Sequence, residues 1–236
     1  MEIFDELLNN SNNEPNALAI FSINIERTQM LITAIDKIKA YNTNYQSSQF
    51  RTNFELGKNI RDIQEKELSK IQRSCTEQAI ISLVIAFESY YKELLNEIIH
   101  LYPGIFVSQN TIYSDKLNSL LEGEKPLNIE DVERELKLRN RFDYFKLFKA
   151  YSIEFVSDEE TEIIEYLYTI RNYLVHCSQR KNSKTESRLK EITRPLKHKY
   201  LGLSTEAKRL LTKMIKIVGE LDKRVKKCCN VLNKDA

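Results

Sequence analysis

Apolar residues recur at intervals of three and four along most of this 236-residue chain, which is the spacing of one face of an α-helix. The pattern predicts a helix at about Ala17–Ala40 and a long helix at about Leu56–His100, and the polar stretch between them is expected to be a loop. A further helix begins near Ser157, where Ser157-Asp158-Glu159-Glu160 fits a capping box. The predicted apolar face of that helix consists of Ile163, Ile164, Leu167, Ile170, Leu174 and Val175. A final pair of helices is expected at about Glu186–His198 and Ser204–Leu232. The predicted fold class is therefore all-α.

The second half of the long helix has a regular apolar seam, in which steps of four and three residues alternate. Such a seam is typical of a helix that packs against other helices along its length. The residues of the seam are Ile80, Val84, Phe87, Tyr91, Leu94 and Ile98.

The block from residue 105 to residue 156 interrupts this long-helix pattern. Short helices are expected there at Tyr113–Leu121, Ile129–Arg139 and Phe142–Tyr151. We interpret the block as an insertion or lid within a single domain, 1–236, and we interpret 186–236 as a basic C-terminal helical extension.

Several broad classes are excluded by composition. The longest apolar stretch, around Ala79–Phe87, is much shorter than the ~20 residues that span a bilayer. The first residues, MEIFDELLNN, are acidic and lack the layout of a signal peptide. The four cysteines show no paired spacing that indicates a disulfide framework. A cytoplasmic protein that does not enter the membrane is expected.

Positive charge is concentrated toward the end of the chain. Residues 177–236 contain 17 Lys and Arg but only 6 Asp and Glu, whereas residues 1–176 contain 19 and 28. A basic face of this kind is typical of proteins that bind a polyanion. It could equally dock onto the acidic half of the same chain, and composition does not separate the two alternatives.

The clearest candidate for a catalytic site is at the end of the helix that begins near Ser157. Arg171 and Asn172 precede His176, one of only three histidines, where the apolar pattern gives way to a polar loop. Asn172 and His176 are four residues apart and share one helix face, and the long side chain of Arg171 can reach the same space. The cations that follow could hold a phosphate chain; they are Arg180, Lys181, Lys184 and Arg188.

Such a set is suited to phosphodiester cleavage without a metal or other cofactor. A histidine can transfer a proton at neutral pH, and an arginine can bind the phosphate and stabilise its developing charge. The helix C-terminus favours a positively charged imidazole, which suits a general acid. One histidine supplies one proton-transfer group, so a complete acid and base pair needs a second, most simply from a partner subunit.

The segment Arg171-Asn172-Tyr173-Leu174-Val175-His176 resembles the R-x(4–6)-H signature of the HEPN superfamily, including the polar residue that often follows the arginine. The helix AIISLVIAFESYYKELLNEII resembles another recurrent segment of that family, in which a glutamate commonly faces the motif helix. Glu88 matches that glutamate. The resemblance covers roughly residues 60–100 and 157–180, which is under half of the chain.

The resemblance implies an antiparallel helical bundle that forms a homodimer, with the two motifs facing one cleft. Many members are metal-independent endoribonucleases of toxin–antitoxin, abortive-infection and antiphage systems, with an antitoxin or another defence protein as partner. Their presumed reaction is attack of the ribose 2′-OH on the adjacent phosphate. On this chain His176 would transfer protons, Arg171 would bind the phosphate and Asn172 would position it. One branch has a regulatory tyrosine two residues after the histidine, but Ser178 stands there in this sequence, so that control is not expected.

Other interpretations are weaker. A non-catalytic HEPN-type module, whose Arg–His pair shapes a dimer interface or binds a nucleotide, is the main alternative. A thiol nucleophile at Cys177 is disfavoured, because a helix C-terminus destabilises a thiolate. A zinc site is disfavoured, because the spacing of His198, Cys228 and Cys229 matches no standard set of zinc ligands. A helical DNA-binding regulator is also disfavoured, because the sequence has no helix-turn-helix pattern.

Overall fold

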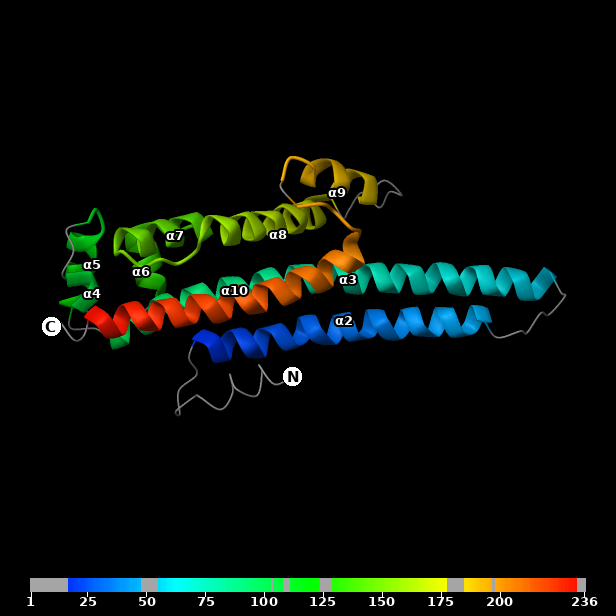
Figure 1. Ribbon diagram of the computed structural model, residues 1–236, viewed down its shortest axis with the longest axis horizontal. Coiled ribbons are helices and arrows are strands. Elements are labelled where there is room, and N and C mark those ends of the chain that lie inside the picture. Colours follow the sequence, from blue (N-terminus) through cyan, green and yellow to red (C-terminus); the bar gives the residue numbers. More distant parts are fainter. Residues whose placement is uncertain are drawn as a thin grey trace. The chain divides into compact units, whose positions relative to one another are not determined.

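All regular structure in the described part of the chain is α-helical, as the hydrophobic pattern predicts. The computed structural model describes residues 17–47, 55–102, 104–107, 111–123, 129–177, 185–196 and 198–232 (Figure 1). The long helices are α2 (Ala17–Ser47), α3 (Glu55–Leu101), α8 (Asp158–Cys177) and α10 (Leu203–Leu232). The shorter ones are α4 (Gly104–Val107), α5 (Ser114–Leu121), α6 (Ile129–Leu136), α7 (Arg141–Ala150) and α9 (Thr185–Thr193).

Three predicted helix ends are wrong. Helix α6 ends at Leu136 instead of Arg139, and the following residue, Lys137, has a positive φ of 57°. Helix α2 continues to Ser47, through polar residues that were expected to form a loop. That stretch contains no glycine or proline, so nothing in it strongly opposes a helix. Helix α9 ends at Thr193 instead of continuing to His198. Pro195 accounts for the early end, because its ring restricts the preceding residue and it has no N–H to donate.

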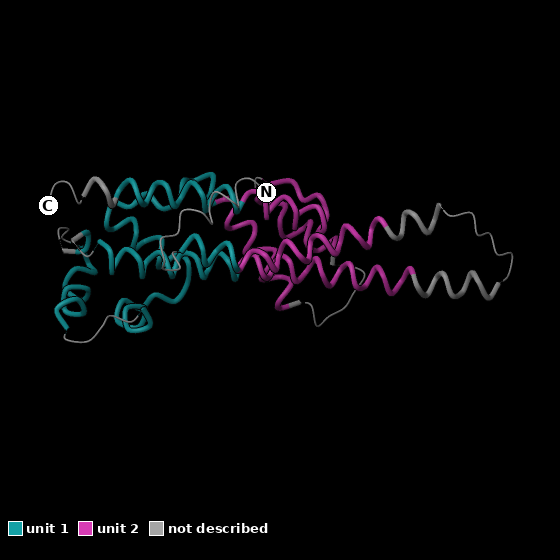
Figure 2. Tube along the Cα trace, turned by 90° about the horizontal axis from the view of Figure 1, so that it is seen from below, with its two compact units in different colours: residues 1–23, 85–161, 214–236 teal, residues 24–84, 162–213 magenta. Residues whose placement is uncertain are grey.

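The chain divides into two compact units, shown in Figure 2. Unit 1 comprises residues 1–23, 85–161 and 214–236, and unit 2 comprises residues 24–84 and 162–213. Helices α2, α3, α8 and α10 each contribute a segment to both units. None of the helices in the described ranges combines the length and apolarity needed to cross a bilayer.

The apolar seam of α3 is buried, as predicted. Its six residues, Ile80, Val84, Phe87, Tyr91, Leu94 and Ile98, are all between 0 and 2% exposed. Ile80 and Val84 belong to unit 2, and the remaining four belong to unit 1. The seam therefore contributes to the core of each unit.

The core of unit 1 is rich in aromatic rings, several of them from the block 105–156. Tyr144 of α7 packs against Tyr91 of α3 with ring centroids 4.7 Å apart, and Phe106 of α4 contacts Tyr151 at the same distance. The Tyr144 hydroxyl also donates to Glu133, which forms a 2.8 Å ion pair with Lys92 of α3. The short helices are thus joined to α3 by both aromatic and polar contacts.

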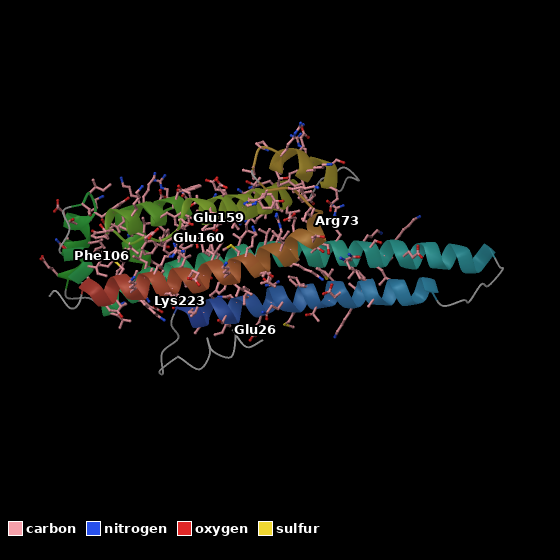
Figure 3. The ribbon with its side chains drawn as sticks, viewed as in Figure 1. Glu26, Arg73, Phe106, Glu159, Glu160 and Lys223 are labelled. Atoms are coloured by element: carbon pink, nitrogen blue, oxygen red, sulfur yellow. The ribbon has the colours of Figure 1, made fainter. Side chains whose placement is uncertain are left out.

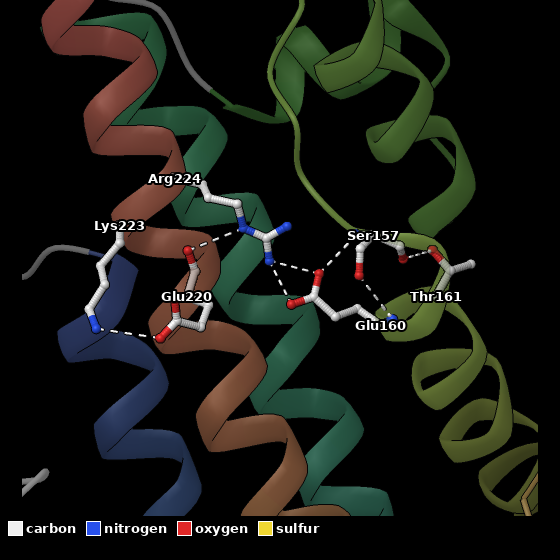
Figure 4. Close-up of polar contacts among 6 residues, drawn as sticks. All are labelled: Ser157, Glu160, Thr161, Glu220, Lys223 and Arg224. Carbon is white, nitrogen blue, oxygen red and sulfur yellow. Dashed lines mark hydrogen bonds and ion pairs between the residues drawn. The ribbon is translucent and has the colours of Figure 1, made fainter.

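Helix α8 begins with the capping box that its sequence predicts. The Ser157 hydroxyl accepts from the backbone N–H of Glu160 at 3.3 Å, and the Ser157 N–H donates to the Glu160 carboxylate at 2.8 Å. The same carboxylate accepts two hydrogen bonds from Arg224 of α10, at 2.6 and 2.7 Å (Figure 4). Burial raises the pKa of the Glu160 carboxyl, but the hydrogen bonds from Arg224 and Ser157 outweigh it and lower the pKa below its ordinary value of 4.5.

Unit 2 is formed by α2 from Asn24 onward, α3 up to Val84, α8 from Glu162 onward, α9 and the start of α10. Lys208 of α10 forms an ion pair with Asp36 of α2, and Lys39 donates to Ser204 at 2.8 Å. Helix α8 presents an apolar face to this core, with Ile164, Leu167, Ile170 and Leu174 between 0 and 2% exposed. Val175 was predicted on the same face, but it is 38% exposed. It lies at the edge of the face, one position beyond Leu174 and three beyond the exposed Asn172.

Replacing Glu160 by Gln is expected to lower the free energy of unfolding by about 1.5–3 kcal/mol, because Arg224 loses a charged hydrogen-bond acceptor. The contribution of the pair is present above pH 4.5 and is lost as the pH falls through the lowered pKa of Glu160. Urea unfolding at neutral pH and at about pH 3 measures both effects, and the difference between wild type and Glu160→Gln should shrink at the lower pH.

Glu159→Gln is the matched control, because Glu159 is the adjacent, exposed carboxylate in the same helical turn (Figure 3). It removes the same charge from the same helix end without touching Arg224. Equal losses of stability in the two variants would contradict a specific role for the Glu160–Arg224 pair.

Candidate functional site

The three residues proposed from the sequence lie in the last two turns of α8, on the side that the core leaves open. Ile170 and Leu174 are buried, whereas Asn172 and His176 are exposed and Arg171 is half-buried. The same helical period that buries the apolar residues therefore places the polar ones at the surface.

Arg171 and Asn172 are in direct contact. The Nη1 atom of Arg171 donates to the Oδ1 atom of Asn172 at 3.1 Å. The Nε atom of Arg171 is buried and has no hydrogen-bond partner among the described residues, nor does the guanidinium form an ion pair with any of them. A buried N–H without a partner is energetically costly, so an anion that accepts from this guanidinium would be stabilised.

His176 is in the last turn of α8, one turn after Asn172. Its imidazole is exposed and makes no hydrogen bond or ion pair to another described residue. The ring is therefore accessible to a ligand that contacts Arg171 or Asn172 on the same end of the helix.

Of the remaining predicted site residues, the structure describes Arg188 and Glu88. Arg180, Lys181 and Lys184 are outside the described residues. Arg188 is on α9, where it is exposed and forms a 2.5 Å ion pair with Glu191. An exposed pair of this kind contributes little stability, so a phosphate could replace the glutamate. Glu88 is half-buried on α3 within unit 1, whereas Arg171, Asn172 and His176 belong to unit 2. Its supporting role stays a prediction.

Much of the positive charge on α10 is compensated within the protein. Cations of α10 form ion pairs with acidic residues earlier in the chain, which are Asp36 for Lys208 and Glu160 for Arg224. Others form pairs within the helix, between Arg209 and Glu206, between Lys223 and Glu220, and between Lys226 and Asp222. Docking onto acidic residues thus accounts for part of the basic C-terminal half.

A second polar cluster, which the hydrophobic pattern did not indicate, is in unit 2. Glu206 is fully buried and accepts two hydrogen bonds from Arg209, at 2.6 and 2.9 Å, and one from the Leu201 N–H at 2.8 Å. The Arg209 guanidinium is 5.2 Å from the ring centroid of Tyr166, and the His198 ring contacts the same tyrosine at 5.4 Å. Tyr166 is on α8, whereas His198, Glu206 and Arg209 lie at or just before the start of α10, so only the fold brings the tyrosine to the other three.

Two polar atoms of this cluster are buried without a hydrogen bond among the described residues, the Tyr166 hydroxyl and Nε2 of His198. Burial raises the pKa of Tyr166, and the neighbouring Glu206 raises it further. Burial also lowers the pKa of His198 from its ordinary value of 6.5, as do Lys213 and Arg209, against the opposing effect of Glu162 and Glu206. Neutral forms of both side chains are therefore favoured.

Metal ligands do not gather in the part of the chain that the structure describes. Within those residues there is no group of three or more His, Cys, Asp or Glu side chains that could hold a metal ion.

Comparison with known proteins gives no relative: no family model, curated protein or solved structure matches this chain.

His198 is expected to make the fold sensitive to mild acid. Because its pKa is lowered in the folded protein, stability is unaffected above pH 6.5 and declines as the pH falls from 6.5 through the folded-state pKa. His198→Phe keeps a ring against Tyr166 but cannot be protonated. Denaturant unfolding of both proteins at a series of pH values between about 7.5 and 5 should show the variant gaining stability relative to wild type as the pH falls.

His100→Gln serves as the control, because His100 is exposed at the end of α3. It should not alter the pH dependence. Parallel pH profiles for wild type and His198→Phe would show that His198 does not govern this sensitivity.

Proposed function

We propose that this protein is a metal-independent endoribonuclease of the HEPN type, acting as a toxin or as an antiphage or abortive-infection effector. The observation that carries the proposal is the end of α8. There a guanidinium without a carboxylate partner among the described residues is hydrogen-bonded to Asn172, one turn before the accessible imidazole of His176.

Arg171 is the phosphate-binding group in this proposal. Guanidinium groups recognise phosphate through paired hydrogen bonds, and their charge is not lost near neutral pH. The contact with Asn172 restricts the guanidinium, so that fewer orientations are lost when the substrate binds.

His176 is the proton-transfer group in this proposal. During cleavage the ribose 2′-OH attacks the adjacent phosphorus, the bond to the 5′-oxygen breaks, and a 2′,3′-cyclic phosphate and a 5′-OH result. The attacking hydroxyl must lose a proton and the departing oxygen must gain one. A single imidazole performs one of these transfers at a time, so the His176 of a second copy is proposed to perform the other in a composite site of the homodimer.

The expected reaction can be tested directly on RNA. Purified wild-type protein should cleave total RNA in EDTA and leave cyclic-phosphate ends. His176→Ala should lower the cleavage rate by about 10²–10⁴-fold, as for loss of a general acid or base. Arg171→Lys retains the charge but loses the planar donor set, and a decrease of about 10²-fold or more is expected.

The controls separate chemistry from folding. His176 is exposed, so its replacement should change the free energy of unfolding by no more than about 0.5 kcal/mol. His100→Ala removes another exposed histidine and should leave cleavage unchanged. A folded wild-type protein that cleaves no RNA, or cleavage indifferent to His176, would instead favour a non-catalytic helical module.

The composite site makes a separate prediction for mixed dimers. Copies with different affinity tags, one wild type and one His176→Ala, can be expressed together and purified through both tags. Because each copy supplies one imidazole, the mixed dimer should be nearly as inactive as the doubly substituted dimer. A mixed dimer with half or full activity would mean that each copy acts with its own histidine alone.

A further inference from the structure

A second concentration of positive charge lies in unit 1, on the segment from Lys137 to Lys149. The segment contains a single carboxylate, that of Asp143, which accepts from the backbone N–H groups of Arg139 and Asn140 in the capping box of α7. Its cations are Lys137, Arg139, Arg141, Lys146 and Lys149. The carboxylate is therefore committed to the helix end and does not neutralise a neighbouring cation.

The lysines of this segment differ from most cations of α10. Lys146 and Lys149 are exposed and form no ion pair or hydrogen bond with another described residue. Most of the α10 cations, in contrast, are paired with Glu or Asp. Lysines that form no ion pair can contact phosphates, and binding through such contacts weakens as the salt concentration rises.

The same segment exposes aromatic rings beside these lysines. Helix α7 buries Tyr144, Leu147 and Phe148 in the core, but it leaves Phe142 40% exposed and Phe145 half-buried. The centroids of these two rings are 6.5 Å apart in an edge-to-face arrangement.

The exposed rings are held in place by contacts on their inner sides. Phe145 packs against Phe155 with ring centroids 5.2 Å apart, and the guanidinium carbon of Arg141 is 4.1 Å from the ring centroid of Phe142. Rings fixed in this way can stack on a base at little cost in side-chain entropy.

An open groove of about 480 Å³ runs along these residues, which is within the ~300–1,000 Å³ typical of ligand sites. Its lining includes aromatic residues and lysines of α7, namely Phe142, Phe145, Lys146 and Lys149. Ser152, Glu154 and Asp158 also line it. The groove therefore combines aromatic faces, cations and hydrogen-bond acceptors.

We propose that this groove binds a segment of single-stranded RNA, with a base stacked on the exposed ring of Phe142 and the adjoining phosphates against Lys146 and Lys149. Stacking on aromatic side chains and tracking of the backbone by cations are the usual means of binding single strands. Glu154 and Asp158 can accept from the exocyclic amino group of a base, as carboxylates do from cytosine, so cytosine is favoured over uracil, which has none. The inference rests on the proposed ribonuclease function for its biological role, but the binding itself does not require catalysis.

Binding can be measured with full-length His176→Ala protein, which prevents cleavage of the probe. The probes are fluorescein-labelled oligo(C) and oligo(U) of about 12 nucleotides, within the range of ~4–16 nucleotides that one single-strand site covers. Fluorescence anisotropy should give tighter binding of oligo(C). Phe142→Ala should weaken binding about tenfold or more, as loss of a stacking platform does, whereas Phe142→Tyr should retain it.

The two lysines are tested through salt. Lys146→Ala/Lys149→Ala should reduce the slope of log Kd against log salt by about 0.7 per lysine, the value for single strands. The matched control is Lys216→Ala/Lys227→Ala, which removes two exposed α10 cations that form no ion pair among the described residues. It should have a markedly smaller effect on affinity, and thermal unfolding confirms that each variant is folded.

Unchanged affinity in Phe142→Ala, or equal loss in the two double-lysine variants, would overturn the proposal, since the charge alone would then explain binding. Concentration-dependent self-association that is lost in Phe142→Ala, without RNA binding, would also overturn it and assign the groove to a protein contact. If RNA binds through the groove but the wild-type protein does not cleave it, the proposed ribonuclease function is wrong and the proposed binding site stands. If the wild-type protein cleaves RNA and the groove variants change neither binding nor cleavage, the proposed binding site is wrong and the ribonuclease function stands.

Discussion

The apolar seam of α3 is the constraint on which both units of the structure depend. From Ile80 to Ile98 its residues are almost wholly excluded from solvent, and they belong in part to unit 2 and in part to unit 1. Burying apolar area is the main favourable contribution to folding, so a seam of this length must be covered along its whole course. In unit 1 the covering residues are largely aromatic, such as Tyr144 of α7 against Tyr91.

Burial of helix faces leaves polar groups that need partners, and the structure satisfies several of them with the same residues. Glu160 caps the start of α8 and also accepts both hydrogen bonds from Arg224 (Figure 4). Glu206 in unit 2 is similarly shared between Arg209 and the Leu201 N–H. Because an unpaired buried carboxylate is costly, the contact of Glu160 with Arg224 favours the packing of α8 against α10 within unit 1, whereas the contacts of Glu206 fix the start of α10.

The functional proposals depend on the polar groups that the fold does not satisfy. Arg171 has a buried Nε atom without a partner among the described residues, and the exposed His176 follows it in the last turn of α8. Lys146 and Lys149 are likewise unpaired within that part of the chain, and they line a groove with exposed aromatic rings. The α10 cations show the opposite arrangement, since most of them are paired. A charge count along the sequence therefore does not distinguish cations that form ion pairs from those that form none within the described residues.

The sequence alone determined the features that depend on neighbouring residues. Helical periodicity predicted the seam of α3 and the apolar face of α8, and residues Ser157 to Glu160 predicted the capping box, because these signals arise within one or two helical turns. For the same reason the periodicity of α8 already indicated that Asn172 and His176 share a face. Local signals were also misread, since Pro195 ends α9 earlier than the apolar pattern indicated.

Contacts between distant residues were decided only by the tertiary structure. Arg224 and Glu160 are 64 residues apart, and nothing near either residue identifies the other as its partner. The cluster of Tyr166, His198 and Arg209 is of the same kind, as is the distinction between paired and unpaired cations. Pairing and burial depend on which helix surfaces meet in three dimensions, and that information is distributed over the whole chain rather than written beside the residues concerned.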